Sequence, residues 1–171
     1  HGGTDPHTMQ TWIRGDHVYL TRVTPSIENI NDVSKYEFYA GRDSSGKPIW
    51  SSRFADIRPV YEWDGRAGCV TMTYNAPLRK YFMVVSTGEE VSTVFDTYIL
   101  EADDVTGPWK LVSYMEQFGK QAYFVNIPSR FINQDGKTVW LCYSANWTGH
   151  RQNPPGSSYS MSLHEMQIVD K

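Results

Sequence analysis

The stretch from Gly68 to Met115 constrains the fold most strongly, because it contains four short apolar segments separated by turn residues. The expected strands are Cys69–Tyr74, Lys80–Ser86, Phe95–Ala102 and Lys110–Met115. β-Branched and aromatic residues favour strands, and the Asn, Pro and Gly residues between them favour turns, so this stretch predicts an antiparallel meander. The second and third segments are nearly continuously apolar, which predicts a sheet buried on both faces. A four-stranded meander of this kind is typical of a propeller blade.

The same order of segments recurs on both sides of this stretch. The second strands of three successive units begin at Val18, Tyr81 and Val139, which are 63 and 58 residues apart. Trp50 and Trp109, which each follow a turn containing Gly and Pro, are 59 residues apart. A regular repeat of this length with several strands in each copy predicts a β-propeller. Further strands are expected near residues 17–23, 35–41, 122–127, 138–144 and 159–169.

The sequence therefore predicts an all-β chain of about three blades, each a four-stranded antiparallel sheet. The expected units are 4–63, 66–115 and 119–169 of one partial domain that covers residues 1–171, and the third unit lacks a clear fourth strand. Closed propellers usually have about four to eight blades, so we expect this chain to be part of a larger propeller. An open stack would leave two apolar faces uncovered, which predicts association with another chain or with the missing blades. Six apolar residues are expected to be buried between blades: Phe82, Val84, Ile99, Trp109, Trp140 and Leu141.

Composition narrows the classes of partner and cofactor. The net charge is −3 and there is no long cluster of Lys and Arg, so neither nucleic acid nor an anionic membrane surface is an expected partner. The apolar runs are too short to span a membrane. No phosphate-binding loop, nucleophile elbow or metal-ligand spacing is present, so no cofactor and no metal are expected. Cys69 and Cys142 are expected to be free buried thiols, although a disulfide between them stays open at this stage.

Five runs carry a resemblance to a known family: HVYLTRV, YEFYAGRDSSGKPIW, TYNAPLRKYFMV, ILEADDVTGPWKLVSYM and YFVNIPSRFINQDGKTVWLCYSAN. In order and spacing they resemble the glycoside-hydrolase-like five-bladed propellers of a former domain-of-unknown-function group, some of which are endo-D-arabinanases. The resemblance covers about Trp12 to Asn146. It implies a propeller that acts on a polysaccharide such as an arabinan, with a poly- or oligosaccharide as partner and a secreted or periplasmic location.

The resemblance also implies catalytic carboxylates on the innermost strands, which open each unit. These strands are expected within Thr4–Trp12, Arg66–Tyr74 and Gly119–Ile127. Only Asp5, with His7 beside it, offers an ionisable pair there, and a frayed terminus is the alternative interpretation. Glycosidases use two carboxylates about 5–9 Å apart, so the other would come from absent blades, or the activity is missing. Asp96, which opens a strand, is the remaining catalytic candidate.

Five residues are candidates for binding a saccharide. Arg66 and Asn126 lie on or beside innermost strands, where they would bind sugar hydroxyls or instead satisfy backbone groups at the channel rim. Tyr74, Tyr123 and Trp147 have aromatic faces that would stack on sugar rings or instead fill the core. Three functions therefore stay open: a glycoside hydrolase-like enzyme, a non-catalytic glycan-binding propeller and a structural fragment. The sugar and the linkage are not predicted.

Overall fold

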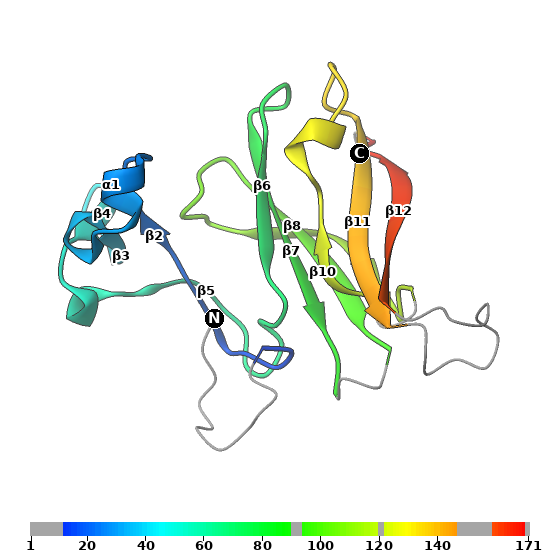
Figure 1. Ribbon diagram of the computed structural model, residues 1–171, viewed down its shortest axis with the longest axis horizontal. Helices are drawn as coiled ribbons and strands as arrows, with labels where there is room; N and C mark the ends of the chain where they lie inside the picture. The colour runs from blue at the N-terminus through cyan, green and yellow to red at the C-terminus, as the bar shows by residue number, and fades with distance from the viewer. Residues whose placement is uncertain (1–11, 90–93, 120–121, 147–158, 170–171) are drawn as a thin grey trace.

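The computed structural model describes residues 12–89, 94–119, 122–146 and 159–169 (Figure 1). These residues form an all-β structure of several antiparallel sheets, none of which closes on itself. In the first part of the chain, β1 (His17–Tyr19) pairs with β5 (Pro59–Glu62), and a separate sheet contains β2 (Thr21–Arg22), β3 (Glu37–Arg42) and β4 (Pro48–Ser51). The middle sheet contains β6 (Thr71–Asn75), β7 (Lys80–Thr87), β8 (Asp96–Ala102) and β9 (Lys110–Met115). The third sheet contains β10 (Tyr123–Asn126), β11 (Thr138–Asn146) and β12 (Tyr159–Gln167).

The middle sheet confirms the predicted meander, because its strands are hydrogen-bonded in chain order and every pair is antiparallel. On one face, Phe82, Val84 and Ile99 pack with Val139 and Leu141 of the third sheet. A fully buried aliphatic side chain contributes about 1.5–3 kcal/mol to folding. The middle sheet and the third sheet are therefore held together mainly by this apolar layer.

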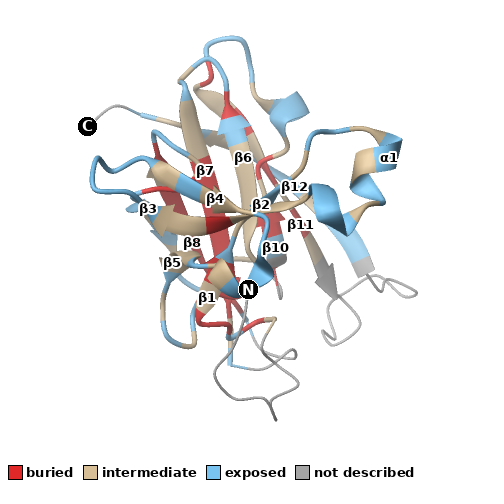
Figure 2. Cartoon of the chain, turned by 90° about the vertical axis from the view of Figure 1, so that its left-hand side faces the viewer, coloured by how far each residue is buried: buried red, intermediate tan, exposed pale blue. Residues whose placement is uncertain are grey.

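The opposite face of the middle sheet is also covered. Met83, Val85 and Leu100 belong to a second buried cluster that includes Val18 from β1 and Ala67 from the segment before β6. Figure 2 shows the buried residues concentrated in β7 and β8. The prediction of burial on both faces is confirmed, and it explains why these two strands are apolar along their whole length.

The strands that open the middle and third sheets lie side by side. The hydroxyl groups of Thr71 and Thr73 on β6 each donate a hydrogen bond of 2.6 Å, the first to the carbonyl oxygen of Val125 and the second to that of Ile127. β6 and β10 thus approach each other through side chain-to-backbone contacts, without a shared ladder, so the two sheets remain separate (Figure 1).

The first part of the chain departs from the prediction of one four-stranded sheet. The strand expected at residues 17–23 is divided into β1 and β2, which belong to different sheets. Pro59 is opposite Tyr19 at the end of the β1–β5 pairing, and proline has no N–H to continue a ladder. The next carbonyl, of Leu20, instead accepts a hydrogen bond of 3.0 Å from the backbone of Tyr39 on β3. The chain therefore changes sheets at this point.

Four short helical segments lie between the strands: α1 (Ile27–Ile30), η1 (Val33–Lys35), η2 (Phe54–Asp56) and η3 (Ser129–Phe131). The first two fall in the polar segment before β3. Ser26 caps α1 by accepting a hydrogen bond from the backbone of Asn29, and Asp32 caps η1 in the same way. Side chains of this kind stabilise helix starts, so the local sequence explains both segments. None of the described residues forms a helix long and apolar enough to span a membrane.

Two turns 61 residues apart have the same geometry. In the β3–β4 turn, Asp43 Oδ1 accepts hydrogen bonds from the backbone and the hydroxyl group of the residue two positions later, and in the β8–β9 turn Asp104 Oδ1 does the same. Gly46 and Gly107 follow with φ angles of 82° and 81°, a region that glycine adopts readily. The spacing of these turns matches the repeat expected from the tryptophans.

Arg42 connects these two turns. Its Nη2 donates to the carbonyl oxygen and the hydroxyl group of Thr106, at 3.2 and 2.7 Å, and to the carbonyl oxygen of Gly107 at 2.6 Å. Partial burial disfavours ionisation of Asp104, but the hydrogen bonds from Thr106 and the positive charge of Arg42 outweigh it and lower the pKa of Asp104. Arg42 therefore fastens the β2–β4 sheet to the middle sheet.

The predictions for individual core residues are mostly confirmed. Phe82, Val84, Ile99 and Leu141 are buried, whereas the prediction was wrong for Trp109 and Trp140, which are only half-buried. Trp109 precedes the edge strand β9, which leaves one side uncovered by any described strand. Trp140 alternates with the buried Val139 and Leu141, so its side chain lies on the outer face of the third sheet. Cys69 and Cys142 are both free thiols.

Candidate functional site

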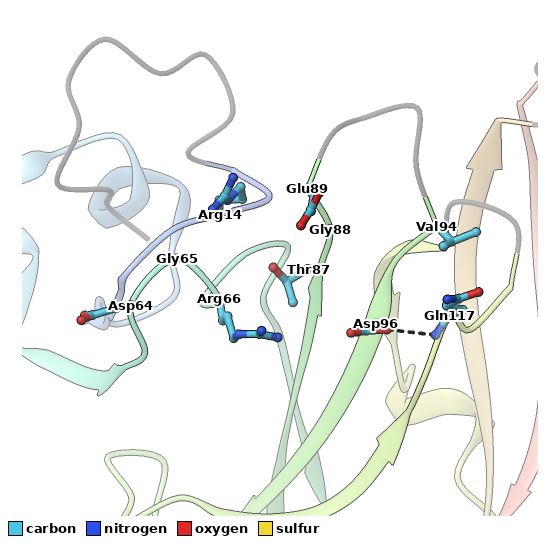
Figure 3. A pocket seen from close by; sticks show the side chains of 10 residues that line it. All are labelled: Arg14, Asp64, Gly65, Arg66, Thr87, Gly88, Glu89, Val94, Asp96 and Gln117. Carbon is cyan, nitrogen blue, oxygen red and sulfur yellow. Dashed lines mark hydrogen bonds between the residues drawn. The ribbon is translucent and has the colours of Figure 1, made fainter.

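A pocket of about 400 Å³ lies where the first part of the chain meets one end of the middle sheet (Figure 3). One wall comes from the segment before β1 and from the segment between β5 and β6. The other comes from the ends of β7 and β9 and the start of β8. The lining residues are Arg14, Asp64, Gly65, Arg66, Thr87, Gly88, Glu89, Val94, Asp96 and Gln117.

The first wall is fixed by backbone contacts. The carboxylate of the buried Asp16 accepts a hydrogen bond of 2.6 Å from the backbone of Gly65, and its carbonyl oxygen accepts one of 2.8 Å from Trp63. The hydroxyl group of Thr87 on β7 donates to the carbonyl oxygen of Ile13 at 2.9 Å. A Cβ atom at Gly68 would lie 2.2 Å from that same oxygen, so this close approach requires glycine. The segment before β1 is therefore held tightly between the β5–β6 segment and β7.

Arg66 is directed from this wall toward the middle sheet. Its Nη1 donates a hydrogen bond of 3.1 Å to the hydroxyl oxygen of Tyr98, and its guanidinium lies 5.7 Å from the ring centroid of Trp63. Arginine has five N–H donors, so most of the hydrogen-bonding capacity of Arg66 is left for a ligand or for water.

Asp96 lies opposite Arg66, at the first residue of β8. Its Oδ1 accepts a hydrogen bond of 2.9 Å from the backbone of Gln117, and its Oδ2 accepts one of 3.2 Å from the hydroxyl group of Tyr114. Desolvation and then the negative charge of Asp96 raise the pKa of Tyr114 to about 12. Tyr114 is therefore neutral near pH 7 and remains a hydrogen-bond donor, which holds the carboxylate in one orientation.

A row of aromatic rings extends beside the pocket from β5 to β9. Tyr61 and Trp63 have ring centroids 6.4 Å apart, Trp63 and Tyr98 are 4.7 Å apart, and Tyr98 and Tyr114 are 4.8 Å apart. The first two contacts are edge-to-face and the last is stacked, which are the favourable arrangements for aromatic pairs. Because Tyr98 binds Arg66 and Tyr114 binds Asp96, this aromatic row fixes both charged side chains of the pocket.

Arg66 and Asp96 point toward one another in Figure 3. They do not form an ion pair: in the part of the chain that the structure describes, no carboxylate oxygen lies within 4.0 Å of the Arg66 guanidinium. The pocket thus presents a donor and an acceptor that face each other with space between them. A ligand group that both accepts and donates hydrogen bonds fits this arrangement.

The structure brings together two of the residues proposed from the sequence, Arg66 and Asp96. Tyr74 is half-exposed at 44% on β6, with its ring centroid 4.7 Å from that of Tyr81, and it does not line the pocket. Asn126 lies at the end of β10, where its Oδ1 accepts a weak hydrogen bond of 3.4 Å from Thr73. Tyr123 is paired with Ser144 in the third sheet. Three proposed residues lie outside the described residues: Asp5, His7 and Trp147.

None of the lining residues lies on β6 or β10, the strands from which the resemblance implied the site residues. The sequence analysis missed Gln117 and Tyr114, although the predicted meander contained the signal. Antiparallel pairing of the last two strands places the start of β8 beside the end of β9. Arg14 and Asp64 gave no such signal, because only the packing of the first part of the chain brings them to the pocket.

The chain was compared with known proteins in three ways, and no family model, no curated protein and no solved structure matches it. Among the described residues, no group of three or more His, Cys, Asp or Glu side chains is arranged to hold a metal ion.

Proposed function

We propose that this chain is part of a carbohydrate-active β-propeller and that the pocket binds a saccharide. The observation that carries the proposal is the unpaired arrangement of Arg66 and Asp96 across the pocket, beside the aromatic row. A sugar diol can donate to a carboxylate through one hydroxyl and accept from a guanidinium through the next. The apolar C–H faces of the sugar ring pack on aromatic side chains.

Three features support the propeller part of the proposal. The middle sheet is a four-stranded meander covered on both faces, as expected for a blade between two others. The strands β6 and β10 lie side by side, as the innermost strands of neighbouring blades would. The turns at Asp43 and Asp104 repeat with the same geometry. The division into the units 4–63, 66–115 and 119–169 agrees with the described sheets, each of which lies within one unit.

The described sheets do not close a ring, whereas propellers do. We therefore propose that further blades, from another chain or from a longer polypeptide, complete the domain. The outer face of the third sheet supports this, because Met161 and Leu163 there are 69% and 42% exposed. Light scattering of the isolated chain is expected to show association, and a clean monomer would contradict this part of the proposal. Action on an extracellular polysaccharide would agree with a secreted or periplasmic location.

Saccharide binding is tested by calorimetric titration with arabino-, xylo- and gluco-oligosaccharides. Arg66→Ala is expected to lower the affinity about 10- to 100-fold, since a hydrogen bond to a charged group contributes about 1.5–3 kcal/mol. Arg130→Ala, at an exposed arginine of η3 outside the pocket, is the matched control and should leave the affinity unchanged. Equal affinities of the Arg66 variant and the unaltered protein would refute the proposed site.

Glycoside hydrolysis is a second candidate function, favoured by one observation. Besides Asp96, the carboxylates of Asp64 and Glu89 line the same pocket, and hydrolysis of a glycosidic bond uses two carboxylates. The hydrogen bonds from Tyr114 and Gln117 favour the ionised form of Asp96, as a nucleophile or a base requires. If arabinan is hydrolysed and both Asp96→Asn and Glu89→Gln abolish the turnover, this candidate replaces simple binding.

A further inference from the structure

Tyr114 presents an aromatic surface directly beside the pocket. It lies on the edge strand β9 and is 49% exposed. One face of its ring stacks on Tyr98, with ring centroids 4.8 Å apart and an interplanar angle of 18°. Because the covered face is accounted for by Tyr98, the exposed part of the side chain includes the opposite face. The hydroxyl group meanwhile donates to Asp96 inside the pocket.

We propose that the outer ring face of Tyr114 forms a second saccharide subsite, so that the site takes a chain of at least two sugar units. This inference rests on the proposed binding of a saccharide in the pocket. A sugar hydrogen-bonded to Asp96 would have its neighbour in the chain next to Tyr114, because the phenol oxygen lies 3.2 Å from the carboxylate. Stacking on the phenol ring then adds affinity without any further polar contact.

The structure also holds this ring rigidly, as a stacking surface requires. Tyr98 is only 7% exposed and supports the inner ring face, and Asp96 fixes the hydroxyl end. Little rotational freedom is therefore lost when a sugar packs on the outer face. By contrast, the similarly exposed Tyr74 lies outside the pocket, which makes it a matched control for an exposed tyrosine.

The ring and the hydroxyl group of Tyr114 have separable roles. Tyr114→Phe keeps the stacking face and removes the hydrogen bond to Asp96, whereas Tyr114→Ala removes both. Both variants should weaken binding of a single sugar to a similar degree, since both release Asp96 from its donor. Only Tyr114→Ala should remove the additional affinity for longer chains.

The experiment measures affinity by calorimetry against arabinose, arabinobiose and arabinotriose, and against the corresponding xylose and glucose series. In the unaltered protein, in Tyr74→Ala and in Tyr114→Phe, affinity for the best series should rise about 3- to 10-fold from one unit to two. In Tyr114→Ala the rise should vanish, and its thermal unfolding curve checks that the variant is folded.

The possible failures are distinct. If mono- and disaccharides bind equally well, or if the rise persists in Tyr114→Ala, the second subsite is refuted while the proposed function stands. If no saccharide of any length binds, the proposed function is refuted together with the subsite.

Discussion

Replacing Arg42 with alanine tests how the first part of the chain is fastened to the middle sheet. The substitution removes the donors to Thr106 and Gly107, both of which are buried, and a bond of 2.5 Å to the carbonyl oxygen of Gly46 within its own turn. A net hydrogen bond contributes about 1 kcal/mol, more when one partner is charged and less when it is exposed. The Arg42 side chain is 31% exposed, so the bonds to the β8–β9 turn are only partly screened by solvent.

The expected loss of unfolding free energy for Arg42→Ala is about 2–3 kcal/mol, because two buried acceptors also lose their donor. Urea unfolding followed by tryptophan fluorescence measures this change. Arg53→Ala is the control: Arg53 pairs with Asp56 at 2.7 Å but is 75% exposed, and exposed ion pairs contribute about 0–1 kcal/mol. If the two substitutions cost the same, Arg42 does not fasten the two sheets.

The same contact predicts a pH dependence. The pKa of Asp104 is lowered in the folded protein, where the ordinary value is 3.8. A carboxyl group of this kind stabilises the fold above its unfolded pKa, and this contribution is lost as the pH falls through the folded pKa. Arg42→Ala should therefore reduce the loss of stability on acidification below pH 4, because part of the cause of the lowered pKa is removed.

Three further predictions follow from individual contacts. Asp96→Asn should lower saccharide affinity about 10-fold, measured by the same titrations as for Arg66, because an amide is a weaker acceptor for sugar hydroxyls. Gly68→Ala should destabilise the fold by about 3 kcal/mol in urea unfolding, since its Cβ would lie 2.2 Å from a backbone oxygen of Ile13. Burial raises the pKa of Cys69 to about 12, so at pH 8 a thiol reagent should label Cys142 well before Cys69; equal rates would contradict this.

The sequence was most informative where local pattern and packing agree. The continuous apolar runs of β7 and β8 could only be explained by burial on both faces, and the structure has both faces covered. The turn at Gly107 and the start of β9 at Lys110 followed from local turn chemistry. In contrast, the division of the 17–23 segment depended on Pro59, which is opposite Tyr19 only after folding. A pairing partner forty residues away leaves no signal in the segment itself.

The site was predictable only in part, for a related reason. Arg66 and Asp96 attracted attention as polar residues where core residues were expected, and both line the pocket. Tyr114 resembled any aromatic strand residue, because its exposure depends on β9 being an edge strand of the middle sheet. Its hydrogen bond to Asp96 required the register of β8 and β9, which the turn between them sets.

The position of the pocket follows from where the repeat breaks down. The β3–β4 and β8–β9 turns repeat, but Trp12–Asp16 and Trp63–Cys69 join through single backbone contacts, such as the one of 2.7 Å between Cys69 and Trp12, instead of a sheet ladder. A segment outside a ladder can place side chains by its turns alone, and here it directs Arg66 over the end of a rigid sheet. Binding residues on loops held by a rigid scaffold are the common arrangement. The irregular packing of the first part of the chain is thus what creates the facing pair of Arg66 and Asp96.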